Sequence, residues 1–233
     1  SSATTSFVSI GSNVALNSGR LLSTAPATGS LAQANYSSVG GLTIQAGTGG
    51  VTIGSTTSLI SNGSSTFGIT SGANVTVGAN ALLQSNGGNL TITGNLTDAG
   101  TVTYAARGFA ATPISIVNGA ITIGTTGASL GVGDIVQSFG AISIGTSPFF
   151  GGSPVSLNGV NVNSSGAGSI GITGSTATIA NSLITTDGAV TVTTTSGLLS
   201  LSTPSATPIS ANAITLKSAG GISVGATQSL IAA

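Results

Sequence analysis

The sequence predicts an all-β protein whose fold class is a parallel β-helix (β-solenoid) of about nine three-strand coils. Three observations lead to this prediction. A phrase of apolar residue, Thr or Ser, and apolar residue returns about every 25 residues. Two further short apolar runs follow each phrase, and turns rich in Gly, Asn and Asp separate the runs. A fixed period of this size indicates a solenoid, in which each repeat buries its apolar face against its neighbours.

The first strand of each coil carries the clearest pattern, as in Ile121-Thr122-Ile123. Successive strand residues point to opposite faces, so the flanking apolar side chains face inward and the hydroxyl faces outward. The outward residues should form a ladder: Thr43, Thr91, Thr122, Ser143, Thr191 and Thr215. The predicted core contains Ile44, Ile53, Ile92, Ile123, Ile144, Val192, Leu216 and Val224.

The third strand of a coil is an apolar pair followed by a polar corner, as in Leu82-Leu83 before Asn86-Gly87 and Leu183-Ile184 before Asp187-Gly188. Asn-Gly and Asp-Gly tolerate left-handed backbone angles, so we expect these corners to use them. Asn-Gly is also typical of two-residue hairpins in an antiparallel meander. Strands of three or four residues that come in threes favour the parallel β-helix instead.

We expect a single β-solenoid domain over 1–233, in which 1–40 form an irregular first coil with a long insertion and 41–233 form regular coils. Stretches 17–40, 93–120 and 145–159 are longer than the others and should hold irregular loops. In the last of them, Phe149 and Phe150 form either an exposed contact loop or a plug that fills a gap in the core.

The composition argues against an enzyme. Only six residues are charged, and the chain has no Glu, His, Cys, Met or Trp, which supply most acid–base, nucleophilic and metal chemistry. Asp98, Asp134 and Asp187 fall in different coils, and we expect no second carboxylate beside any of them. Glycoside hydrolysis needs a carboxyl pair. We therefore predict no catalytic residues, no metal and no cofactor.

Net charge and hydropathy indicate the environment and partners. The net charge is zero, so nucleic acid is not an expected partner and self-association is. No apolar stretch reaches the roughly 18 residues of a membrane-spanning helix. The chain does not begin with Met, which indicates a processed protein or a piece of a larger one. We expect an extracellular or cell-surface location, with other cells or surfaces as further partners.

Four phrases carry a family resemblance: GGLTIQAGTGGVTIG, GGNLTITGNL, NGAITIGTTGASL and DGAVTVTTTSGLLSL. They resemble the repeats of large bacterial exoproteins of the filamentous haemagglutinin and autotransporter-passenger type, over about residues 40–233. The resemblance implies a right-handed β-helix, export across a bacterial envelope, and a role in adhesion, biofilm or surface fibres. The Asn-Pro-Asn-Gly motif of the secretion domains in such exoproteins does not occur, so the chain should be a repeat segment or a separate subunit.

The predicted function is a structural subunit of a self-assembling extracellular fibre. The sequence opens near a first-strand phrase, Phe7 to Ile10, and closes on a third-strand phrase, without a polar cap at either end. Open strand edges recruit other strands, so head-to-tail stacking should make a homopolymer. Its predicted interface comprises Val8, Ile10, Val14, Leu16, Ile214, Leu216, Ile222, Val224, Leu230 and Ile231.

Two alternatives stay open from the sequence. The chain could be a stalk segment of a large secreted adhesin. It could also be an ice-binding β-solenoid that uses paired Thr columns. Thr91-Ile92-Thr93 and Thr191-Val192-Thr193 fit such pairs, whereas Thr122-Ile123-Gly124 breaks them.

Overall fold

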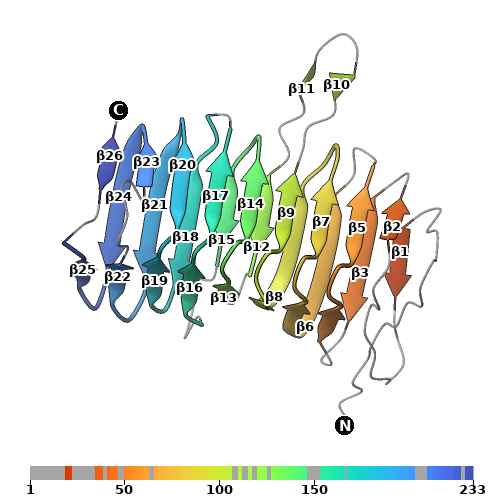
Figure 1. Ribbon diagram of the computed structural model, residues 1–233, viewed down its shortest axis with the longest axis horizontal. Coiled ribbons are helices and arrows are strands. Elements are labelled where there is room, and N and C mark those ends of the chain that lie inside the picture. Colours follow the sequence, from red (N-terminus) through yellow and green to blue (C-terminus); the bar gives the residue numbers. More distant parts are fainter. Residues whose placement is uncertain are drawn as a thin grey trace.

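The protein is a rod of stacked β-strands (Figure 1). The computed structural model describes residues 19–22, 35–38, 41–46, 50–62, 66–106, 110–111, 115–116, 120–124, 127–145, 153–165, 167–202, 209–226 and 229–232. All the regular secondary structure in these residues is β-strand, and the ladders that build the rod are parallel. The predicted parallel β-solenoid is therefore confirmed.

Strand segments from successive coils align into three limbs that run along the rod. The first limb contains β1 (Gly19–Leu22), β3 (Leu42–Ala46), β6 (Phe67–Val77), β8 (Leu90–Asp98), β12 (Ile121–Ile123), β15 (Ile142–Ile144), β18 (Ile170–Gly174), β21 (Ala189–Thr194) and β24 (Ala213–Ser218). The second limb contains β4 (Val51–Ile53), the later parts of β6 and β8, β13 (Gly127–Leu130), β16 (Val155–Asn158), β19 (Ala177–Ala180), β22 (Leu199–Ser202) and β25 (Ile222–Val224). The third limb contains β2 (Asn35–Ser38), β5 (Ser58–Ser61), β7 (Leu82–Ser85), β9 (Thr103–Ala106), β14 (Ile135–Ser138), β17 (Asn161–Ser164), β20 (Leu183–Thr186), β23 (Ile209–Ala211) and β26 (Leu230–Ala232).

The three limbs form two main sheets rather than three. Strands β6 and β8 continue around the corner, so the first two limbs join into one 15-stranded sheet, and the third limb is a nine-stranded sheet. A short antiparallel pair, β10 (Ala110–Ala111) and β11 (Ser115–Ile116), interrupts the coil after β9. Six coils consist of three separate strands. Strands β6 and β8 each run through two limbs, and the coil of β1 and β2 has no second-limb strand among the described residues. The solenoid thus amounts to about six turns of three separate strands, and the predicted count of nine such coils is slightly too high.

The long stretches expected to be irregular are partly regular. Residues 93–98 complete β8, residues 103–106 form β9 and residues 155–158 form β16, all paired in register with neighbouring coils. Backbone pairing to both neighbours therefore extends the regular coil further than the apolar phrases alone indicated.

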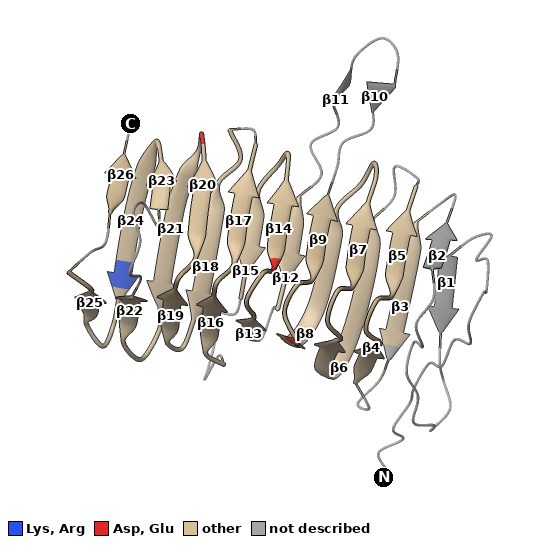
Figure 2. Ribbon diagram, viewed as in Figure 1, with Lys and Arg blue, Asp and Glu red and all other residues tan. Residues whose placement is uncertain are grey.

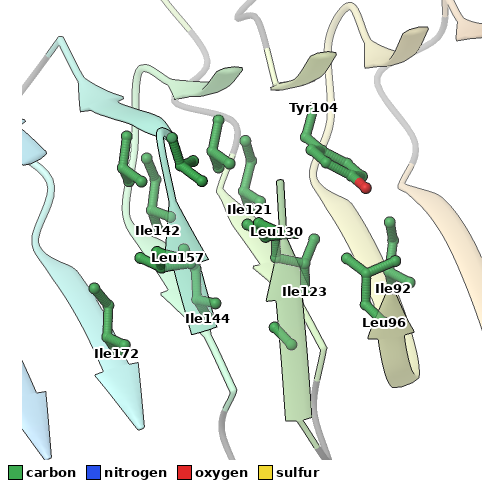
Figure 3. Packing of buried hydrophobic residues seen from close by; sticks show 14 of the residues in the cluster. Ile92, Leu96, Tyr104, Ile121, Ile123, Leu130, Ile142, Ile144, Leu157 and Ile172 are labelled. Carbon is green, nitrogen blue, oxygen red and sulfur yellow. The ribbon is translucent and has the colours of Figure 1, made fainter. Parts of the chain in front are cut away.

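The core is built from columns of identical position in successive coils. Ile92, Ile123, Ile144 and Ile172 follow one another through the register of the first limb, and all have less than 1% of their surface exposed (Figure 3). The predicted core residues Ile44, Ile53 and Val192 are buried in the same way. Each apolar side chain packs between its counterparts in the coils above and below, so each coil depends on its two neighbours to bury its apolar surface.

Hydroxyl side chains form columns on the outside. The predicted first-limb ladder is present, since Thr122 pairs with Thr91 and Ser143, and Thr191 with Thr215. Gly68 and Gly171 interrupt it. The second limb carries a hydroxyl column without interruption, formed by Thr52, Thr76, Thr97, Ser129, Ser156, Thr178, Ser200 and Ser223.

Left-handed residues lie at a different corner from the one predicted. Among the described residues, six of them come two residues before a third-limb strand, in the turn after the second limb, with φ between 50° and 86°: Thr56, Asn80, Thr101, Gly133, Gly159 and Asn181. The other residues with positive φ are glycines in other places, such as Gly124 and Gly145 directly after β12 and β15. Gly87 and Gly188, at the predicted corners, do not have positive φ. The expectation for the Asn-Gly and Asp-Gly corners was therefore wrong.

Buried hydroxyl groups explain why those corners need no left-handed residue. Five third-limb strands end on an inward hydroxyl, and Ala106 of β9 interrupts this column between Ser85 and Ser138. Its members are Ser61, Ser85, Ser138, Ser164 and Thr186. The Ser138 hydroxyl accepts a hydrogen bond from the backbone N–H of Gly140 at 2.9 Å, and Thr186 accepts one from Gly188 at 3.0 Å. These hydroxyls accept hydrogen bonds from backbone N–H groups of the turn, which have no partner in a strand ladder.

Replacing Thr56 by Asn should stabilise the protein. Thr56 has φ 56°, a region that β-branched residues rarely occupy, and its N–H donates to the Ala79 carbonyl at 2.8 Å, which holds it there. Asn tolerates this conformation, so we expect a gain of roughly 0.5–1 kcal/mol in unfolding free energy. Chemical denaturation measures it. The control Thr52→Asn, on an ordinary strand, should give no gain in stability. An equal gain in both variants would show that backbone strain at Thr56 is not the cause.

Candidate functional site

Two aspartates and a tyrosine enter the inward columns at one level of the rod. The inward column of the second limb reads Ile53, Val77, Asp98, Leu130, Leu157, Ile179 and Leu201. Asp98 is its one polar member, and it is half-buried at the end of β8. A carboxyl group in an apolar column loses hydration and needs hydrogen-bond partners.

Tyr104 and Asp134 reach the same place from two other columns. The third-limb inward column reads Leu59, Leu83, Tyr104, Val136, Val162, Ile184 and Ile209, with Tyr104 fully buried. Asp134 precedes β14 and is also buried, at the position that Val102 and Val160 hold in adjacent coils. Figure 3 shows Tyr104 extending from β9 on the side of the core where Ile92 and Leu96 lie.

The carboxyl groups of Asp98 and Asp134 meet on a single backbone N–H. Gly131 N–H donates to Asp98 Oδ1 at 3.0 Å and to Asp134 Oδ2 at 2.6 Å. The Tyr104 hydroxyl donates to Asp98 Oδ2 at 2.9 Å, and Gly100 N–H to Asp98 Oδ1 at 3.2 Å. We call Asp98 and Asp134 the acid pair.

Asp134 also joins successive coils. Its Oδ1 accepts a hydrogen bond from the Val102 N–H of the preceding coil at 2.8 Å. Ser182 does the same two coils later, where its hydroxyl accepts from the Val160 N–H at 3.1 Å. An inward polar residue at this corner therefore satisfies an N–H of the coil before it, and a hydroxyl suffices for that role. The second carboxyl oxygen of Asp134 goes beyond that role, because it shares the Gly131 N–H with Asp98.

Burial and the neighbouring carboxylate determine the protonation of the site. Burial is the largest cause that raises the pKa of Asp134, and the proximity and negative charge of Asp98 act in the same direction. The hydrogen bonds from Val102 N–H and Gly131 N–H lower the pKa, and the net result is a rise from 3.8 to about 7. Burial, followed by the charge and hydrogen bond of Asp98, raises the pKa of Tyr104 well above 10. Tyr104 is therefore a neutral donor, and Asp134 holds a proton in weakly acid solution.

The acid pair corrects the expectation that each aspartate stands alone. Asp98 and Asp134 accept from the same N–H, whereas Asp187 lies exposed in the turn after β20 (Figure 2). A signal for Asp98 was present in the sequence. Leu96-Thr97-Asp98 aligns with Val75-Thr76-Val77, which places Asp98 in a core column. The sequence-based argument against glycoside hydrolysis assumed that no two carboxyl groups lie together, and the acid pair removes that assumption.

The geometry of the acid pair nevertheless suits a structural role better than catalysis. Glycoside hydrolysis places two carboxyl groups about 5 Å or more apart with the substrate between them. Here the two groups accept from one backbone N–H, that of Gly131, and each accepts from further donors of the protein. Within the described ranges, no group of three or more His, Cys, Asp or Glu residues could hold a metal ion.

The last coil exposes what the other coils bury. Ile222 and Val224 in β25 each have 46% of their surface exposed, whereas their register partners Leu199 and Leu201 are buried. Leu230 in β26 is 40% exposed, although it pairs with the buried Ile209. Strands β24, β25 and β26 are each at the end of their ladder. We call this surface the last-coil edge, formed by Ile214, Leu216, Ile222, Val224, Leu230 and Ile231.

The predicted interface residues have different outcomes. Ile214 and Leu216 pack partly buried against the core, and Ile222, Val224, Leu230 and Ile231 are exposed. The prediction that Val224 is a core residue was wrong, because no coil among the described residues covers it on one side, and Leu216 is only partly buried for the same reason. Val8, Ile10, Val14 and Leu16 lie outside the described residues, and so do Phe149 and Phe150.

Nothing among the residues that the structure describes forms a helix long and apolar enough to cross a membrane. Comparison of the chain with protein-family models, with curated proteins and with solved structures finds no match.

Proposed function

We propose that the protein is a structural extracellular β-solenoid, a subunit of a surface or matrix fibre in which the last-coil edge stacks on the first coil of another copy. The observation that carries the proposal is the exposure of three apolar side chains, Ile222, Val224 and Leu230. Their register partners in the preceding coil are buried: Leu199, Leu201 and Ile209. A further coil would cover these side chains in the way that each coil covers the one before it.

The backbone of the last-coil edge supports the same mode of assembly. Strands β24, β25 and β26 have a paired neighbour on one side, so their outer N–H and C=O groups face away from the rod. Such an edge accepts another parallel strand through main-chain hydrogen bonds, and the apolar columns then supply the side-chain contact. Because the same coil geometry repeats, one non-closing contact yields a filament.

Charge gives little resistance to this stacking. The whole chain has a net charge of zero, and Lys217 in β24 is the one charged residue of β24, β25 and β26 (Figure 2). Proteins that stay monomeric usually carry a net charge that opposes association. The chemistry of a fibre subunit requires neither metal nor cofactor, and the partner in this proposal is a second copy of the chain. The resemblance to bacterial exoprotein repeats supports a cell-surface location.

An alternative function is ice binding, favoured by the uninterrupted outward column from Thr52 to Ser223 on the second limb. That column is single: Gly78, Ala99 and Ala180 occupy the outward positions two residues beyond Thr76, Thr97 and Thr178. Paired columns are therefore incomplete there, as they are in the first limb. A thermal hysteresis measurement separates this alternative from the fibre.

Placing Lys at both Ile222 and Val224 should abolish polymerisation. The two cations would sit on every stacking contact with their charge desolvated, which costs several kcal/mol for each interface. Sedimentation velocity over a concentration series, with electron microscopy of the same samples, should show filaments for the unmodified protein and monomers for the double variant.

The matched control is Leu183→Lys in β20, a residue that is 41% exposed on the side of the rod and away from the last-coil edge. It adds a cation at a comparable exposure and should leave filaments intact. If the unmodified protein stays monomeric at high concentration, the fibre proposal is wrong. The alternative of a stalk segment, in which another coil of the same chain covers the edge, would then take its place.

A further inference from the structure

We infer that the acid pair is a proton-dependent contact between two successive coils: one shared proton holds Asp98 against Asp134, and loss of that proton loosens the rod at this level. The inference stands on the meeting of two carboxyl groups on the single N–H of Gly131. Two carboxylates in this position repel each other unless one of them carries a proton.

The contact lies where the rod has an interruption. Asp98 and Tyr104 belong to the coil of β8 and β9, Asp134 belongs to the next coil, and β10 and β11 lie between them in the sequence. Gly131 N–H and Val102 N–H connect these two coils through the acid pair. Regular ladder bonds continue between β9 and β14 on one side and between β8 and β13 on the other. The acid pair therefore stabilises the corner between two intact ladders.

No described cation lies beside the acid pair to replace the proton. The titratable group that faces it from β9 is Tyr104, a neutral donor, and β8 and the turn before β14 contribute Asp98 and Asp134 themselves. The other described carboxylate, Asp187, and the cation Lys217 belong to β20's turn and to β24, several coils away (Figure 2). Arg107 lies outside the described residues. A proton is thus the counterion that the described geometry provides.

The direction of the pH effect follows from the raised pKa of Asp134, about 7 in the folded protein against 3.8 as its ordinary value. Below about pH 4 the group is protonated in both the folded and unfolded states. Between about pH 4 and pH 7 only the folded protein holds the proton, so unfolding releases it and stability falls as pH rises. Above about pH 7 the contribution is lost and the dependence becomes flat.

Thermal unfolding at pH 5 and pH 8 tests the inference on the full chain. The melting temperature should fall by roughly 5 °C or more between the two values for the unmodified protein. Asp134→Asn keeps this side chain neutral at every pH: its amide oxygen can accept from Val102 N–H and its NH₂ can donate to Asp98. Gly131 N–H, from which an NH₂ cannot accept, keeps Asp98 Oδ1 as its acceptor. This variant should unfold near the unmodified protein's temperature at pH 5 and change little by pH 8. Asp187→Asn is the matched control and should keep the full pH dependence.

A direct titration keeps the inference testable if Asp134→Asn does not fold. The carboxyl carbon-13 signals of the three aspartates, followed by NMR, should show one group of the folded protein that titrates near pH 7. Hydrogen exchange of the amides of Val102 and Gly131, corrected for the intrinsic effect of pH, should speed up above that value. If all three carboxyls titrate below pH 5, or if Asp134→Asn and Asp98→Asn both keep the unmodified pH dependence, the inference is overturned.

Discussion

Replacing Ile123 by Asp should unfold the centre of the rod. Ile123 is fully buried in β12 and stacks between Ile92 and Ile144 in the neighbouring coils (Figure 3). A carboxylate there would either stay charged without a partner or be forced to take up a proton, and the isoleucine packing would be lost as well. Together these effects cost about 5 kcal/mol or more, a large part of the stability of a typical domain. Circular dichroism should show loss of the β-sheet signal.

The neighbouring residue supplies the control for this prediction. Thr122 lies on the same strand and points outward, half-exposed, in the hydroxyl ladder between Thr91 and Ser143. Thr122→Asp introduces the same charge one residue away and should cost less than about 1 kcal/mol, because water solvates the carboxylate. Native spectra for the Ile123 variant, or equal damage from both variants, would show that the register of the rod is wrong.

Among Gly→Ala substitutions in the rod, we expect Gly145→Ala to cause the largest loss of stability. Gly145 follows β15 with φ 64°, and its N–H donates to the Ile123 carbonyl at 3.0 Å. A Cβ on this backbone would lie 2.6 Å from Val155 Cγ2 and would overlap the Thr173 carbonyl oxygen of the next coil. Because that oxygen belongs to the backbone, the coils would have to separate. We expect a loss of about 3 kcal/mol in unfolding free energy, measured by denaturant titration.

Gly68 provides a matched test of the same chemical change. It lies within β6 without a positive φ, and a Cβ added there would meet nothing within 4 Å. Gly68→Ala should therefore be neutral or stabilising by up to about 1 kcal/mol, since Ala loses less backbone entropy than Gly on folding. Equal effects of the two substitutions would mean that close approach between coils does not set the requirement for glycine.

The rod can be recognised from residue types and their spacing, whereas the acid pair and the last-coil edge can be recognised only from the position of residues within a column. Neither the acid pair nor the last-coil edge depends on an unusual residue type, since Asp, Tyr, Ile, Val and Leu all occur elsewhere in the chain. What distinguishes them is position within a column. Asp98 is notable because Val77 and Leu130 are its neighbours, and Val224 because its register partner Leu201 is buried while it is not.

The sequence by itself determined the period, the strand positions and the direction of most side chains. Those features depend on short-range alternation, which a strand translates directly into inward and outward faces, as Thr122 and Ile123 illustrate. The repeat of the alternation then implies stacking, because no single coil buries its own apolar face.

Only the tertiary structure decided which side chains from different coils meet. Asp98 and Asp134 are 36 residues apart, and the β10–β11 interruption between them hides their common register from a simple repeat count. Corner geometry was decided in the same way. After the third limb, the hydroxyls of Ser138 and Thr186 satisfy backbone groups of the turn, and a left-handed residue is found instead in the turn after the second limb, which contains Thr56. Both depend on contacts between coils, which local propensity does not encode.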